Sequence, residues 1–105
     1  MIKRLVFSTA LVIFAFSIKA QTIPADINAL LQKNTCYTCH AANKKIIGPT
    51  WTEVAAKKYS KKQFTGFVAK PVPANWPGYP PMAPLPNVPK GDIEKIYGWV
   101  STLAK

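Results

Sequence analysis

Both cysteines and the only histidine of this 105-residue chain lie in one short segment, Cys36-Tyr37-Thr38-Cys39-His40. Two thiols three residues apart can add to the two vinyl groups of a haem, and the adjacent imidazole can then bind the iron as its proximal ligand. A tetrahedral zinc site would need a fourth strong ligand, and the chain has no further Cys or His. The segment therefore predicts one haem c, covalently attached at Cys36 and Cys39, with His40 on the iron.

Two other interpretations of the paired thiols are weaker. A thioredoxin-like redox pair is expected beside a strand–helix–strand pattern, and the sequence has none. A disulfide between Cys36 and Cys39 would close so short a loop that it would restrict little of the unfolded chain. One further class of function stays open: a small secreted basic binding module that has a Cys36–Cys39 disulfide and no haem. The mass of the exported protein would distinguish it.

The second axial ligand of the iron follows by elimination. The candidates are Met82, a lysine or no residue at all. Met82 stands in Tyr79-Pro80-Pro81-Met82-Ala83-Pro84, where prolines restrict the backbone and lower the entropic cost of presenting a weakly donating sulfur. Packing as a gap-filler is the alternative for this side chain. An iron bound by both His40 and Met82 has no position left for substrate or oxygen, which favours electron transfer over catalysis.

The N-terminal segment 1–20 has the pattern of a secretory signal peptide. Lys3 and Arg4 precede an apolar run over 5–18, and Ala20 is the small residue at the expected cleavage site. The run is shorter than the ~20 apolar residues that a membrane span needs. An uncleaved anchor or a buried helix is the alternative. We therefore expect a cleaved leader and one domain over 21–105, exported into an oxidising compartment.

The spacing of apolar residues predicts an all-α domain of four short helices. They are expected over 24–33, 50–59, 60–68 and 92–104. The capping boxes T-x-x-E and S-x-x-Q mark the starts of the second and third helices, and Tyr59 is placed to pack against Phe64. Most of the ten prolines fall within 70–89, so this stretch is expected to form a loop without helix or central strand.

The sequence resembles the small bacterial class I cytochromes c, which are soluble monohaem electron carriers of the periplasm. The likeness covers nearly all of 24–104. It rests on the haem-attachment segment, on Ile47-Gly48-Pro49-Thr50-Trp51-Thr52-Glu53-Val54-Ala55-Ala56-Lys57, on Pro81-Met82 and on Ile96-Tyr97-Gly98-Trp99-Val100. It implies the class I cytochrome c fold, in which three to four short helices surround one haem and a proline-rich loop carries the methionine ligand.

The resemblance also implies roles for single residues. The backbone carbonyl of Pro49 would accept a hydrogen bond from the free ring nitrogen of His40 and so fix its tautomer. Trp76 would donate its indole N–H to a haem propionate, with ordinary loop packing as the alternative. Trp99 and Tyr97 would pack the last helix against the first helix and the haem. Gly98 would permit a close approach of two helices, unless it is a glycine tolerated at the surface.

A domain of this size cannot build a large core alone, so the haem is expected to serve as its centre. The side chains expected to pack around it are Ile27, Leu30, Leu31, Ile47, Trp51, Val54, Phe64, Phe67, Ile96, Trp99 and Val100. The apoprotein should therefore be largely unfolded.

The net charge of +10 points to an anionic partner or surface. Lysines cluster over 57–62 and at 44–45. Nucleic acid is excluded as the partner of an exported haem protein. Redox proteins with acidic docking patches are preferred, with a dehydrogenase or quinol-oxidising complex as donor and an oxidase, reductase or peroxidase as acceptor. Weak contact with anionic membrane headgroups, or a merely solvated face, is the alternative.

The expected function is that of a one-electron carrier in a periplasmic respiratory chain, not that of an enzyme. The alternative is a five-coordinate haem protein that senses or reacts with a peroxide or a diatomic gas, with Met82 unbound. Carbon monoxide binding to the ferrous protein would distinguish the two.

Overall fold

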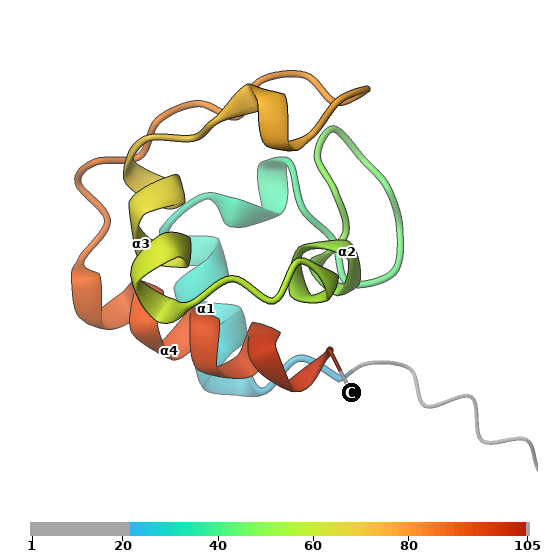
Figure 1. The fold of residues 1–105 in the computed structure, drawn as a ribbon. Coiled ribbons are helices and arrows are strands. Elements are labelled where there is room, and N and C mark those ends of the chain that lie inside the picture. The colour runs from blue at the N-terminus through green and yellow to red at the C-terminus, as the bar shows by residue number, and fades with distance from the viewer. Residues whose placement is uncertain (1–21, 105) are drawn as a thin grey trace, which may run out of the picture.

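The computed structural model describes residues 22–104, and the expected signal peptide at 1–20 lies outside them. This part of the chain is helical and contains no β-strand (Figure 1). Its elements are α1 (Ala25–Lys33), η1 (Cys36–Thr38), α2 (Trp51–Ala56), α3 (Lys61–Ala69), η2 (Pro73–Asn75) and α4 (Lys90–Thr102). No helix within 22–104 is long and apolar enough to span a membrane. The predicted all-α class is confirmed.

Side-chain caps fix where α2 and α3 begin. The Thr50 hydroxyl accepts a hydrogen bond from the backbone N–H of Glu53 at 3.1 Å. Ser60 and Gln63 form the complete reciprocal box, each side chain accepting from the backbone N–H of the other residue. Both helix starts therefore follow from local sequence, as predicted.

The end of α2 differs from the prediction. The helix ends at Ala56 and does not reach Tyr59, because Lys58 adopts a left-handed backbone conformation with φ of 52°. This turn directs the chain into α3. The ring of Tyr59 then packs edge-on against Phe67, with ring centroids 4.8 Å apart, and the ring of Phe64 meets Tyr97 on α4.

The proline-rich segment is mostly irregular, but the prediction of no helix is wrong at one place. Residues Pro73–Asn75 form the 3-10 turn η2, which a proline can open because its missing N–H has no partner in the first turn. A β-turn follows, in which the Tyr79 N–H donates to the Trp76 carbonyl at 3.2 Å. Gly78 supplies the positive φ of 88° that the turn needs after Pro77.

Helix α4 is the element on which the others assemble. It packs against α1, α2 and α3, and in Figure 1 it runs below α2 and α3 and crosses in front of α1. The buried apolar side chains are Ile27, Leu31, Trp51, Ala55, Phe64, Ile93, Ile96, Trp99 and Val100. Most of the predicted core is therefore buried. Leu30, Val54 and Phe67 are half-buried, whereas Ile47 is 46% exposed, because it stands on the irregular segment before α2.

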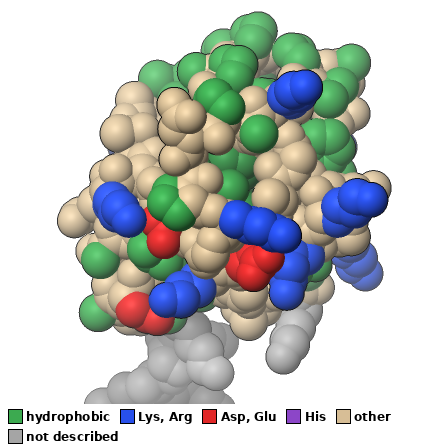
Figure 2. Space-filling view, turned by 90° about the vertical axis from the view of Figure 1, so that its left-hand side faces the viewer, with side chains coloured by type: hydrophobic (Ala, Val, Ile, Leu, Met, Phe, Trp, Pro, Cys, Tyr) green, Lys and Arg blue, Asp and Glu red, His purple; other side chains and the backbone are tan. Residues whose placement is uncertain are grey.

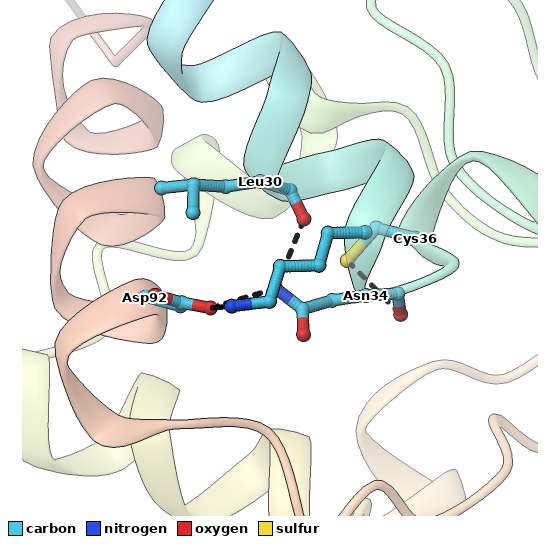
Figure 3. Close-up of polar contacts among 5 residues, drawn as sticks. Leu30, Asn34, Cys36 and Asp92 are labelled. Carbon is cyan, nitrogen blue, oxygen red and sulfur yellow. Dashed lines mark hydrogen bonds and ion pairs between the residues drawn. The ribbon is translucent and has the colours of Figure 1, made fainter.

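A polar network joins the end of α1 to the start of α4 (Figure 3). The side-chain N–H₂ of Asn34 donates to the Leu30 carbonyl at 2.9 Å and to the Asp92 carboxylate at 3.3 Å. Lys33 forms an ion pair with the same carboxylate oxygen at 3.0 Å. The Asn34 carbonyl in turn accepts a contact of 3.8 Å from the Cys36 thiol. The network thus places the first cysteine relative to the packed pair of helices.

Replacing Asp92 with asparagine is expected to lower the thermal midpoint near pH 7, with a smaller loss in acid. Hydrogen bonds from Lys33 and Asn34 hold the pKa of Asp92 below its ordinary value of 3.8. The carboxylate therefore stabilises the fold above the pKa of the unfolded chain, and this contribution disappears as the pH falls through the folded-state pKa. Thermal unfolding at about pH 7 and about pH 3 measures the difference. Asp26→Asn, which removes a first-turn acid from α1, is the control. Equal losses at both pH values would contradict the account.

The expected role of Gly98 in close helix packing is wrong. Gly98 is exposed, and a Cβ built on it meets no atom within 4 Å. Its only effect is then the conformational freedom it gives the unfolded chain. Gly98→Ala is expected to raise the free energy of unfolding by about 0.5–1 kcal/mol, measured by denaturant titration. Gly66→Ala in α3, where the added Cβ also meets open space, should give a similar gain. A loss in stability at position 98 would restore the packing role.

Candidate functional site

The two cysteines stand on η1 and the residue after it. Thr35 opens this turn in a left-handed conformation with φ of 61°, and the Cys39 and His40 N–H groups both donate to the Cys36 carbonyl. Both thiols are unpaired and half-buried. Burial raises the pKa of the Cys36 thiol. The turn therefore presents two free thiols and the imidazole from one short piece of backbone.

The imidazole of His40 is buried and held in one orientation. Its Nδ1 lies 2.7 Å from the carbonyl oxygen of Pro49, and the centroid of its ring lies 4.6 Å from that of the Trp51 ring. A carbonyl only accepts, so Nδ1 carries the proton and Nε2 keeps a free lone pair. Burial lowers the pKa of His40, while the bond to Pro49 opposes this. His40 is therefore a neutral donor ready to bind a metal through Nε2.

Gly48 is a site residue whose role the sequence did not reveal. A Cβ at this position would lie 3.1 Å from the Cys39 carbonyl oxygen and 3.1 Å from Cε1 of His40. The Gly48 N–H also donates to that carbonyl at 2.8 Å. A side chain here would press on the Cys39 carbonyl and the imidazole, so glycine lets the backbone pass close to the ring and bring the Pro49 carbonyl to Nδ1. The Gly-Pro pair belongs to the motif that carries the family resemblance, but the contact of Gly48 with His40 is tertiary and cannot be inferred from neighbouring residues.

The thiols and the imidazole line a cavity of about 270 Å³. Met82, half-buried in the proline-rich segment, lines the same cavity, as do Trp76 and the partly exposed Ile47. No Asp, Glu, Lys or Arg of the described chain belongs to this lining. The Nε1 atom of Trp51, another lining residue, is buried without a hydrogen-bond partner in the described structure. Two thiols, one imidazole and one thioether in an apolar cavity form a donor set that fits haem.

Contacts of Trp76 and Tyr79 join the proline-rich segment to α2 and to the residue after it. Lys57 Nζ lies 4.7 Å from the centroid of the Trp76 ring, which meets the Tyr79 ring edge-on. The Tyr79 hydroxyl donates to the Glu53 carboxylate. This bond raises the pKa of Tyr79. The bond joins positions 26 residues apart, so no local pattern could have predicted it. The propionate contact expected of Trp76 stays a prediction.

Comparison with known proteins decides the family. The chain is 32% identical over 78 residues to cytochrome c-552 of Nitrosomonas europaea, which covers 70% of this chain and 75% of that protein. It is 35% identical over 80 residues to cytochrome c-551 of Allochromatium vinosum. This match covers 72% of this chain and 83% of that protein. The chain belongs to the class I cytochromes c. No protein-family profile matches it.

The fold supports the same assignment. The crystal structure of Nitrosomonas europaea cytochrome c552 matches with a TM-score of 0.64 and 30% identity, over 72% of this chain and 98% of that one. A class I cytochrome c carries covalent haem c, and the C-x-x-C-H segment at 36–40 is its attachment motif. The predicted family, fold and cofactor are confirmed. The chain is thus a haem electron carrier.

Proposed function

We propose that this cytochrome c is a one-electron carrier of the periplasm, with His40 and Met82 as the two axial ligands of its iron. One observation carries the proposal: His40, with its Nε2 free, and Met82 line one apolar cavity together with both thiols. When bound, the haem supplies an iron that exchanges a single electron between its ferric and ferrous forms. With both axial positions filled by side chains, substrate and oxygen find no open coordination site.

The residues of the chain supply position and environment. Cys36 and Cys39 would hold the cofactor by thioether bonds, and the Pro49 carbonyl keeps the His40 ring from rotating. The apolar lining excludes water, and a thioether ligand such as Met82 stabilises the reduced form relative to a second nitrogen ligand. Trp76, which lines the cavity, is proposed to donate its indole N–H to a propionate.

The surface suits brief encounters with acidic redox partners. Figure 2 shows hydrophobic side chains gathered at the end of the molecule that the proline-rich segment forms, with one basic side chain among them and the other charged side chains below. Ile46, Ile47 and Val72 are the exposed large apolar residues of the described chain. Lys44, Lys45 and Lys57 are exposed too. An apolar contact area with lysines nearby steers an acidic partner and releases it quickly. Electron exchange with such a partner should slow as ionic strength rises.

Optical spectroscopy of the exported protein tests the proposal. Sharp c-type bands on reduction, a weak near-infrared sulfur-to-iron band in the ferric form and resistance of the ferrous form to carbon monoxide are expected. Haem bands without the sulfur band, together with carbon monoxide binding, would contradict the proposed carrier and favour the five-coordinate haem protein. The mass of the mature protein tests export, since cleavage after Ala20 leaves a chain that begins at Gln21.

A further inference from the structure

The segment that carries Met82 is tethered on both sides. On its C-terminal side, the Leu85 N–H donates to the Val68 carbonyl of α3 at 2.9 Å. On its N-terminal side, the Tyr79 hydroxyl donates to the Glu53 carboxylate of α2. Between the two tethers stand Pro80, Pro81 and Pro84, which have no N–H to donate and only limited backbone freedom. The position of Met82 therefore depends on the two ends of this stiff piece of chain.

The tether at Tyr79 is built from several contacts. Lys45 Nζ lies 4.4 Å from the centroid of the Tyr79 ring, and the Trp76 ring meets it edge-on with centroids 6.0 Å apart. Lys57, which also lies against Trp76, donates to the Asn75 carbonyl at 3.3 Å. The phenol is thus held between a cation, an aromatic edge and a carboxylate acceptor. A hydrogen bond to a carboxylate is stronger than one between neutral groups.

We propose that Tyr79 is a positioning residue: its bond to Glu53 holds the stiff Met82 segment down on the cavity and so keeps the sulfur on the iron. The proposal rests on Met82 being the axial ligand. A weak thioether bond survives only while its loop is ordered, because each opening exposes the iron to competing ligands. Removing one tether should raise the population of the open segment without removing the haem. Tyr79 also lines the cavity, and its hydroxyl, which is bound to Glu53, acts on the iron site through Met82.

Binding of imidazole to the ferric haem-loaded protein measures this opening, because imidazole must displace Met82. Tyr79→Phe keeps the ring and removes the hydroxyl, and it is expected to raise the affinity for imidazole about threefold to tenfold, the range that follows from losing one partly exposed, charge-assisted hydrogen bond. The sulfur-to-iron band should disappear at lower denaturant concentration than in the wild type. Tyr97→Phe, which removes a hydroxyl that donates to the Tyr59 carbonyl, is the matched control and should leave imidazole affinity unchanged.

Two further variants separate positioning from general weakening. In a Glu53→Ala background, Tyr79→Phe should add nothing, because the bond is already absent. In a Met82→Ala background, Tyr79→Phe should leave imidazole affinity unchanged. An unaltered affinity in Tyr79→Phe alone, with the sulfur band present in the wild type, would overturn the positioning role and leave the proposed function intact. Absence of that band from the wild type would overturn both.

Discussion

A chain with alanine at both Cys36 and Cys39 should show no cooperative unfolding transition and little helical circular dichroism at 25 °C. The packing explains this expectation. Helices α1, α2 and α3 each pack on α4, while the cavity wall formed by the proline-rich segment, which includes Val72, Trp76 and Met82, would face the haem. Without the covalent links the cofactor can leave, and this wall then has no partner.

The size of the domain makes the effect large. Helices of six to thirteen residues, as found here, are marginal in isolation. A small domain buries too little apolar surface to offset the entropy of ordering its chain. The expected loss is therefore the whole stability, which for native domains is about 5–15 kcal/mol.

Thermal and denaturant unfolding followed by circular dichroism measure this result. Cys36→Ala alone, which keeps the second thiol, is the matched control and should give an intermediate stability with one thioether bond. A cooperative transition in the double variant, with helicity like that of the haem-loaded protein, would show that the buried side chains around α4 suffice to fold the chain.

Local signals explain which parts of the fold could be predicted. The caps at Thr50 and Ser60 and the apolar spacing of the last helix act over three or four residues, and these elements begin where expected within a few residues. The early end of α2 depends on Lys58, an ordinary residue in a left-handed conformation that only the tertiary path of the chain imposes. No pattern of neighbouring residues signals such a turn.

The glycines show the same division within the site. Gly98 lies in a helix of the family motif, yet its neighbourhood is open, whereas Gly48 lies against the His40 ring. Sequence alone gives both the same residue type, and only the distances assign their roles. The haem-attachment motif can be predicted from the sequence because its chemistry is confined to five consecutive residues. The contact of Tyr79 with Glu53 cannot be predicted in this way, because it joins separate segments.

Replacing Met82 with alanine should convert the protein from a carrier that excludes ligands to one that binds them. The sulfur-to-iron band should disappear, carbon monoxide should bind the ferrous form, and the reduction potential should fall by on the order of 0.1 V, since axial ligands together tune haem potentials over about 0.8 V. The reason is that Met82 would be the thioether donor in the cavity that it lines together with His40.

Leu85→Ala is the matched control, because Leu85 lines the same cavity and is half-buried like Met82. It removes apolar packing without removing a sulfur, so it should weaken stability while the sulfur band and the resistance to carbon monoxide persist. Spectral titration with carbon monoxide and potentiometry of the two variants, each compared with the wild type, give the measurement. If Met82→Ala kept the wild-type potential and still excluded carbon monoxide, another side chain would be the ligand. The exposed lysines, of which Lys45 lies over the Tyr79 ring, would then be the first donors to replace. An equal effect of both variants would instead assign Met82 to packing alone.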